Sequence, residues 1–229
     1  MKSCPAFISM PLISSLQGKT MKLLAVLGCV WVLVGCSAMP AAQLEATLET
    51  KVVCCKDVKA FEYTPLRPDA DARFVLDEKS PVYQFARGKS YFKAFEIETV
   101  PNRVLFVKSY FNGMLIGQYL QPIFLFLDTR YEPLVALTPR QDFEEGNMFR
   151  DNNAHMVGGV RIPESAKYVI VYTAKFDTPP SAATTRPSTG VFMSGTTPIV
   201  TQNPGKSIQL ERAPVGELLL RTFDIPPIK

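Results

Sequence analysis

The pattern of hydrophobic and polar positions changes twice along the chain. Residues 23–36 form an uncharged apolar run, and residues 41–59 form a stretch that mixes charged and apolar positions. From Arg73 onward, aromatic and β-branched residues alternate with polar ones in short segments, a period of two that is typical of half-buried strands. The pattern therefore predicts an apolar leader, a tether with a short helix that Asp57 could cap, and a mainly β domain.

Many short strands with few helical segments predict an antiparallel β-sandwich, of the jelly-roll or immunoglobulin-like kind. Asn112-Gly113 predicts a tight hairpin turn, because such a turn needs residues that accept positive φ. Segments 123–127 and 167–174 are apolar on both faces, as expected of central strands. The segments that we expect to be strands are 73–77, 82–85, 90–97, 103–111, 115–120, 123–127, 134–137, 158–162, 167–174, 191–193, 207–210 and 216–223.

Two stretches interrupt this pattern. Residues 142–153 are polar and predict an exposed loop, whereas residues 178–190 contain three prolines and many Ser and Thr residues and predict a surface linker or long loop. Pro133 stands beside a short apolar run, which suits the first residue of a strand or an edge strand. We expect Asp128-Thr129-Arg130 before it to be a polar turn that sets strand register rather than a ligand site.

The apolar run has the features of a secretory signal peptide: Lys22 precedes it and small residues end it. Its last residues, Leu33-Val34-Gly35-Cys36, resemble a bacterial lipobox, which implies cleavage before Cys36 and acylation of that cysteine, with palmitate among the expected chains. The alternative is an uncleaved membrane helix, because the uncharged stretch is long enough to span a bilayer. Met21 is a better start for such a signal than Met1, so residues 1–20 are expected to be an extension.

Cleavage changes the charge of the protein. The signal contains three lysines and no acidic residue, so the formal charge falls from +4 to +1 in the mature chain. A balance this close to zero, without a run of Lys or Arg, gives no basis for nucleic-acid binding. The expected organisation is a signal at 1–35, a lipidated tether with a short helix and a Cys pair at 36–66, and a β-sandwich domain at 67–229.

Cys54 and Cys55 are the only cysteines of the mature chain besides Cys36. Their Cα atoms must lie about 3.8 Å apart, closer than in most disulfides, so a bridge between them would be strained. We favour two packed structural thiols. The mature chain has only one histidine and no further unmodified cysteine, which are too few ligands to complete a zinc site with this pair. A vicinal bridge stays open as the alternative in an oxidising compartment.

No arrangement typical of an enzyme stands out. His155 is the only histidine and has no local nucleophile and orienting carboxylate, so we expect a loop or edge residue. Asp142, Glu144, Glu145 and Asp151 cluster in one predicted loop, where carboxylates are usually just solvated. The sequence therefore predicts a protein that is not an enzyme and that needs no cofactor or metal.

Several segments resemble the maltose-operon periplasmic protein family (MalM). They are Cys54-Cys55, Phe61-Glu62-Tyr63-Thr64-Pro65-Leu66, 77–85, 88–92, 126–133 and 168–178, with a looser match after that. The resemblance implies an envelope protein connected with maltose and maltodextrin uptake, and it transfers no catalytic residue. The expected partners are the membrane, through the lipid on Cys36, and an oligosaccharide or an envelope transport protein. Because Ser37 rather than Asp follows Cys36, we expect anchoring to the periplasmic face of the outer membrane. The alternative function is an envelope structural or assembly lipoprotein that binds another protein through a sheet edge.

Overall fold

The computed structural model describes residues 39–68, 70–98, 100–112, 117–146, 151, 153–175, 181–184, 188–205 and 207–224. The chain forms two compact units, Met1–Ser37 and Ala38–Lys229, and all of the described residues belong to the second unit. The residues predicted to form the leader and the lipobox, with Cys36, therefore lie outside the described residues. Among those described, no helix is both long and apolar enough to cross a membrane.

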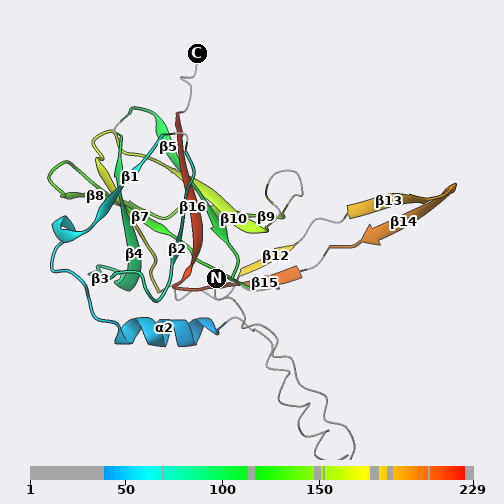
Figure 1. The fold of residues 1–229 in the computed structure, drawn as a ribbon, viewed down its shortest axis with the longest axis horizontal. Coiled ribbons are helices and arrows are strands. Elements are labelled where there is room, and N and C mark those ends of the chain that lie inside the picture. The colour runs from blue at the N-terminus through cyan, green and yellow to red at the C-terminus, as the bar shows by residue number, and fades with distance from the viewer. Residues whose placement is uncertain are drawn as a thin grey trace, which may run out of the picture. The chain divides into compact units, whose positions relative to one another are not determined.

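Two β-sheets form the body of this unit, which is mainly β as the sequence predicts (Figure 1). The first sheet has the order β1-β4-β11-β7-β8, with β3 paired to β4, and the second has the order β2-β16-β5-β10-β9. All neighbours within these two sheets are antiparallel except β1 and β4. The first sheet contains β1 (Tyr63–Leu66), β3 (Val82–Phe85), β4 (Gly88–Ile97), β7 (Ile123–Leu127), β8 (Pro133–Leu137) and β11 (Tyr168–Tyr172). The second contains β2 (Ala72–Leu76), β5 (Arg103–Tyr110), β9 (Gln141–Glu144), β10 (His155–Arg161) and β16 (Gly216–Asp224).

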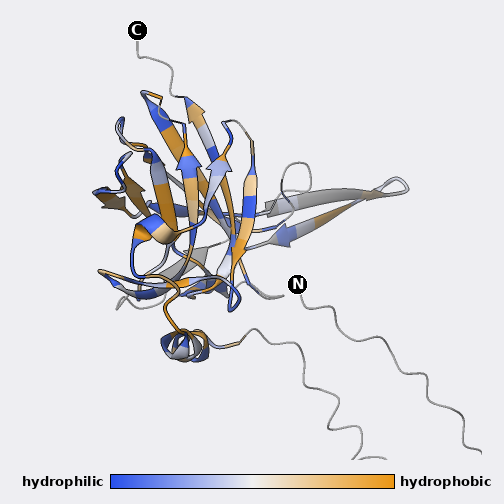
Figure 2. Cartoon of the chain, turned by 60° about the vertical axis from the view of Figure 1, so that its left-hand side comes forward, coloured by the Kyte–Doolittle hydropathy of each residue, from blue (hydrophilic) through white to orange (hydrophobic). Residues whose placement is uncertain are grey.

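The main core contains side chains from both sheets. Tyr91 and Phe95 of the first sheet belong to the same buried cluster as Leu105, Leu218 and Leu220 of the second. Side chains alternate between the faces of a strand, so one face of each sheet supplies this cluster. Figure 2 shows the resulting mixture of hydrophobic and hydrophilic residues along the strands. The packing confirms the predicted sandwich, and the central strands expected at 123–127 and 167–174 are β7 and β11.

A helix precedes the sandwich. Helix α2 (Ala41–Thr50) buries Leu44 and Leu48, and Leu48 joins the main core. A 3₁₀ turn, η2 (Val58–Ala60), follows, and the Asp57 side chain accepts a hydrogen bond from the Lys59 N–H at its start. Both the short helix and the Asp57 cap are as predicted. Because β1 begins at Tyr63, the end of the segment expected to be a tether instead supplies a strand of the first sheet.

The remaining strands lie outside these two sheets, and the strands that the sequence predicts at 115–120, 191–193 and 207–210 overlap three of them. β12 (Ser181–Thr184) pairs with β15 (Ser207–Arg212), which also pairs in parallel with the short β6 (Gln118–Tyr119). β13 (Ser188–Ser194) pairs with β14 (Thr197–Asn203). The prediction of a loop at 178–190 is therefore wrong for 181–184 and 188–190, which are parts of the paired strands β12 and β13.

Two further predictions about turns and loops are corrected or left open. Residues 141–144 form β9, and Asp151 is half-buried, so 142–153 is not one solvated loop. At the predicted Asn112-Gly113 hairpin, the Asn112 N–H donates to the Gln118 carbonyl at 2.7 Å, but 113–116 lie outside the described residues. The Asp128 turn and the edge position of β8, which begins at Pro133, are as predicted.

Candidate functional site

The outer face of the first sheet carries a second apolar cluster, separate from the main core. Phe92, Ile170 and Tyr172 of the sheet are covered by Phe61, which stacks on Phe92 with ring centroids 4.1 Å apart. Cys55 and Val58 also pack against this cluster. The segment from the Cys pair to Phe61 therefore acts as a cover over the outer face, and the sheet is buried on both sides.

Three tyrosines lie together at this outer cluster. Tyr63 comes from β1, Tyr131 from the turn before β8, and Tyr168 from β11. The rings of Tyr131 and Tyr168 are nearly parallel, with centroids 4.4 Å apart, and Tyr63 lies 4.6 Å from Tyr168 and 5.5 Å from Tyr131. All three side chains are only partly buried. We refer to these three residues as the tyrosine platform.

The turn at Asp128 positions Tyr131. One oxygen of the Asp128 carboxylate accepts hydrogen bonds from the N–H groups of Arg130, at 2.7 Å, and Glu132, at 2.9 Å. The Glu132 N–H is the main cause that holds the pKa of Asp128 below its usual value, followed by the N–H and side chain of Arg130. Tyr131 has φ of 67°, in the left-handed region that a bulky residue rarely adopts. Such a conformation costs on the order of 1–3 kcal/mol and tends to occur at functional sites.

Two hydroxyl groups of the platform have raised pKa values. A hydrogen bond with Tyr131, together with burial, raises the pKa of Tyr168 to about 12. Burial, followed by the neighbouring Tyr131 and Tyr168, also raises the pKa of Tyr63, whose hydroxyl donates to the Val58 carbonyl at 2.9 Å. The platform combines flat apolar ring faces with hydroxyl groups, which suits a ligand that has both apolar faces and hydroxyl groups, such as a sugar.

Cys54 and Cys55 are joined by a disulfide between neighbours whose Cα atoms lie 3.8 Å apart. The structure therefore has the vicinal bridge, the alternative to the two unbonded thiols that the sequence favoured. The Cys54 N–H donates to the Val82 carbonyl at 2.8 Å, while Cys55 packs on the outer cluster. The bridge is thus part of the cover over that cluster, beside Phe61.

His155 forms a polar cluster on the second sheet with Asp151 and Glu144, two of the acidic residues predicted to be solvated. Asp151 accepts hydrogen bonds from Lys108, at 3.0 Å, and from the Tyr110 hydroxyl, at 2.8 Å. Burial alone would raise the pKa of Asp151, but these two hydrogen bonds outweigh it and hold the pKa below its usual value. His155 is 2% exposed at the start of β10, so the expectation of a loop or edge residue is wrong.

The neighbours of His155 indicate a structural role. Its Nδ1 lies 2.8 Å from the Asn153 carbonyl, and its Nε2 lies 3.4 Å from a Glu144 carboxylate oxygen. The ring also lies 5.5 Å from that of Tyr110. β10 pairs with β5 on one side and β9 on the other, so the histidine joins three strands. Asp142, Glu144 and Glu145 are exposed as predicted, and Asp142 forms a long ion pair with Arg140 at 4.0 Å.

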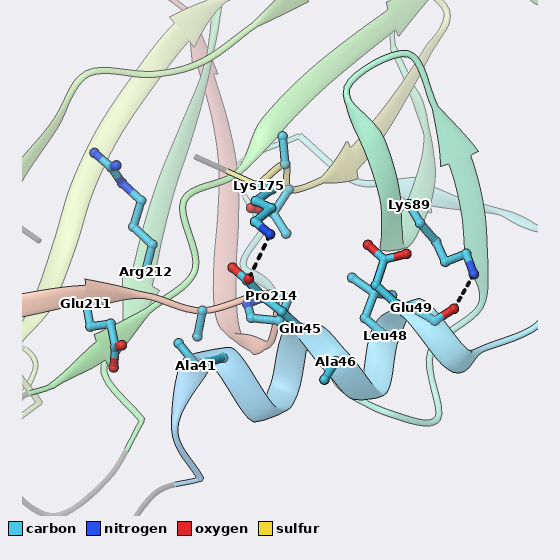
Figure 3. Close-up of a pocket in the computed structure, with 14 residues that line it drawn as sticks. Ala41, Glu45, Ala46, Leu48, Glu49, Lys89, Lys175, Glu211, Arg212 and Pro214 are labelled. Carbon is cyan, nitrogen blue, oxygen red and sulfur yellow. Dashed lines mark hydrogen bonds and ion pairs between the residues drawn. The ribbon is translucent and has the colours of Figure 1, made fainter. Parts of the chain in front are cut away.

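A cavity of about 540 Å³ lies between α2 and the base of β15 (Figure 3). Its charged lining is balanced, with Glu45, Glu49 and Glu211 against Lys89, Lys175 and Arg212. Lys175 forms an ion pair with Glu45 at 3.7 Å, and Lys89 donates to the Glu49 carbonyl at 2.6 Å, so both lysines attach α2 to the sandwich. The volume is in the range of small-ligand sites, but the cavity has no aromatic ring in its lining.

Sequence reasoning did not identify the platform, although its residues were in view. Tyr63 and Tyr131 stand inside segments that carry the family resemblance, and Tyr168 stands in a strand that was expected to be central. Their convergence depends on the pairing of β1, β4 and β11, which no local pattern reveals. Among the residues that the structure describes, no group of three or more His, Cys, Asp or Glu side chains could hold a metal ion.

Comparison of the chain with protein-family models, with curated proteins and with solved structures found no match in any of the three. The resemblance to the maltose-operon periplasmic protein family therefore stays a prediction from sequence motifs.

Proposed function

We propose that this protein is a non-enzymatic envelope lipoprotein that assists the uptake of maltose and maltodextrins and binds an oligosaccharide on the tyrosine platform. Cys36 carries the lipid and anchors the domain to the periplasmic face of the outer membrane. The support for this location is the lipobox-like sequence, followed by Ser37. The support for the ligand is the family resemblance together with the platform.

One observation carries the proposal: a turn places Tyr131 in an unfavourable backbone conformation so that its ring stacks on Tyr168. A tyrosine needed only for packing could be placed in an ordinary conformation. Here the cost of the left-handed backbone is met by the hydrogen bonds of Asp128, and the result is a partly exposed aromatic surface. A pyranose ring presents apolar C–H groups on one face and hydroxyls at its rim, which matches such a surface.

The test is calorimetry of the full chain with maltodextrins, in a zwitterionic detergent that lacks a sugar head group. Y131N removes the ring, while asparagine still accepts the left-handed backbone. We expect heat with the wild type and a loss of affinity of about tenfold or more in Y131N, since contacts of this kind are worth roughly 0.5–1.5 kcal/mol beyond their buried area. Retention of full affinity by Y131N would contradict the platform.

A matched control separates the platform from the cavity beneath α2. K175A removes the Glu45 ion pair at the cavity without touching an aromatic ring. We expect it to bind maltodextrin as the wild type does. If K175A lost binding while Y131N kept it, the sugar would bind in the cavity instead.

The second candidate function is binding of another envelope protein through a sheet edge, and β8 is the feature that favours it. β8 is the edge of the first sheet, and Leu134 and Val135 on it are exposed. An exposed edge with apolar side chains can accept a strand from a partner. A pull-down from envelope extract that recovers a partner with the wild type but not with V135K would support this function.

A further inference from the structure

β12 pairs with β15, and β13 pairs with β14, in the same antiparallel register. Ser181 faces Leu210 and Thr184 faces Ser207, and the same offset continues where Ser188 faces Asn203 and Ser194 faces Thr197. Gly195, with φ of 63°, and Thr196 form the two-residue turn between β13 and β14. Glycine with positive φ at the first turn position is typical of a tight hairpin of the II′ type. We refer to the strands β12 to β15 (181–212) as the arm.

The tip of the arm is apolar on both of its faces. Ile199 and Val200 are neighbours on β14, so their side chains point to opposite faces of the ribbon, and they are 49% and 57% exposed. Met193, which faces Pro198 across the ribbon, is 65% exposed. A ribbon that packed on a flat protein surface would need only one apolar face. Apolar residues on both faces instead suit an environment that surrounds the tip.

Charge along the arm favours a lipid surface as that environment. Over the arm, 181–212, the sequence contains three basic residues and a single acidic residue, Glu211 at the base, although the whole chain has 21 acidic residues. The surface of a bilayer with anionic lipids repels carboxylates and attracts basic groups. Because the one carboxylate lies at the base, the rest of the arm avoids this repulsion, and exposed polar residues such as Thr189 and Gln202 can hydrogen-bond to lipid head groups.

The base of the arm lies beside the start of α2. The Gln118 side-chain amide donates to the Met39 carbonyl at 3.0 Å and to the Glu211 carboxylate at 2.9 Å, so it joins these two segments. Met39 is only three residues after Cys36, and three residues of chain reach at most about 10 Å. If Cys36 carries the lipid, as in the proposed function on which this step rests, the base of the arm is held near the membrane surface.

We propose that the arm tip, with Met193, Ile199 and Val200, inserts into the head-group region of the lipid bilayer and makes a second membrane contact besides the lipid on Cys36. β13 and β14 have seven residues each, about 23 Å at 3.3 Å per residue, so the tip can contact the bilayer at a distance from the anchor. Insertion is shallow, to about 5–10 Å. Deeper insertion would take unpaired strand edges into hydrocarbon, where their N–H and C=O groups have no partners. Two contacts of this kind would fix the orientation of the sandwich on the membrane.

The experiment uses tryptophan fluorescence of the full chain in vesicles of phosphatidylethanolamine and phosphatidylglycerol. Trp31 is the single tryptophan of the sequence and lies in the signal that cleavage before Cys36 removes, so M193W reports on the tip alone in the mature protein, and a W31F background excludes any uncleaved chain. V75W in the same background is the matched control, because Val75 is a 52% exposed aliphatic residue on β2 of the sandwich. We expect a blue shift for M193W and strong quenching by brominated lipid, and neither effect for V75W. An added I199D substitution should remove both effects.

Three outcomes would overturn the inference. They are unquenched emission of M193W, equal quenching of M193W and V75W, and a blue shift of M193W that needs no vesicles, because the last would mean burial in protein or in a second copy. Flotation of the same vesicles reports separately on the anchor. Flotation without quenching of M193W rejects the arm contact and leaves the lipoprotein proposal standing. Quenching of M193W that persists with C36A supports the arm contact even where the anchor is absent.

Discussion

The first sheet of the sandwich and the arm are both built from strands, but they differ in what surrounds each strand. In the sheet, β11 lies between β4 and β7 and its side chains are packed on both faces. In the arm, β13 and β14 pair only with each other within the described part of the chain, and Met193, Ile199 and Val200 are exposed. A two-stranded ribbon by itself is marginally stable. The difference indicates that the sheet supplies the stability of the fold. The arm adds little stability, and its exposed apolar tip is available for contact with another surface.

The largest expected effect separates these two regions directly. Phe124 on β7 is fully buried in the main core, and F124A should lower the free energy of unfolding by about 3–5 kcal/mol through the cavity that it leaves. I199A on the arm should change it by no more than about 0.5 kcal/mol. Chemical denaturation of the two variants measures both values. A large loss in I199A would mean that the arm is part of the cooperative core.

The second expected effect concerns acid. Because the folded-state pKa of Asp151 lies below its unfolded value of 3.8, the stability that it contributes is present above about pH 4 and is lost as pH falls through the lower folded pKa. D151N removes this contribution, at a cost of about 1.5–3 kcal/mol at pH 7 since Lys108 and Tyr110 lose a charged partner. Unfolding curves of D151N should therefore depend less on pH below pH 4. An unchanged acid limb would show that Asp151 does not control the acid stability of the sandwich.

The third expected effect tests the cover over the outer cluster. The disulfide between Cys54 and Cys55 closes no loop of intervening residues, so it constrains the unfolded chain very little. The C54S/C55S double variant should lose about 1 kcal/mol or less, through weaker packing of residue 55. Its affinity for maltodextrin should equal that of the wild type in calorimetry. Loss of binding in a folded double variant would assign a functional role to the bridge.

The smallest effect is expected at the tip of the arm. G195A places a side chain where φ is 63°, which costs roughly 1 kcal/mol, but the strain can be relieved by fraying of the two strands next to the turn. Global unfolding should change by less than about 0.5 kcal/mol, while hydrogen exchange of the amides of β13 and β14 becomes faster. Slower or unchanged exchange in the arm would show that the turn does not hold the ribbon together.

Local patterns in the sequence were sufficient for much of the sandwich. Period-two alternation located β3 to the residue, and the two-sided apolar segments are the central strands β7 and β11 of the first sheet, with β7 also located to the residue. The side chains of Asp57 and Asp128 accept hydrogen bonds from N–H groups two residues further along the chain. Such turns depend only on a few neighbouring residues. These features follow from short-range chemistry, so the sequence by itself determined them.

The arm, the burial of His155 and the tyrosine platform were decided by tertiary structure. Proline, Ser and Thr at 178–190 indicate a loop when read locally, but strands β12 and β13 form there because β15 and β14 are available to pair with them. His155 is buried because β5 and β9 flank β10. Tyr63 and Tyr168 meet because β1 and β11 both pair with β4, and Tyr131 joins them because β7, which leads into its turn, pairs with β11. Each of these depends on contacts between residues far apart in the chain, and hydrogen bonds and burial supplied by such distant partners override local preference.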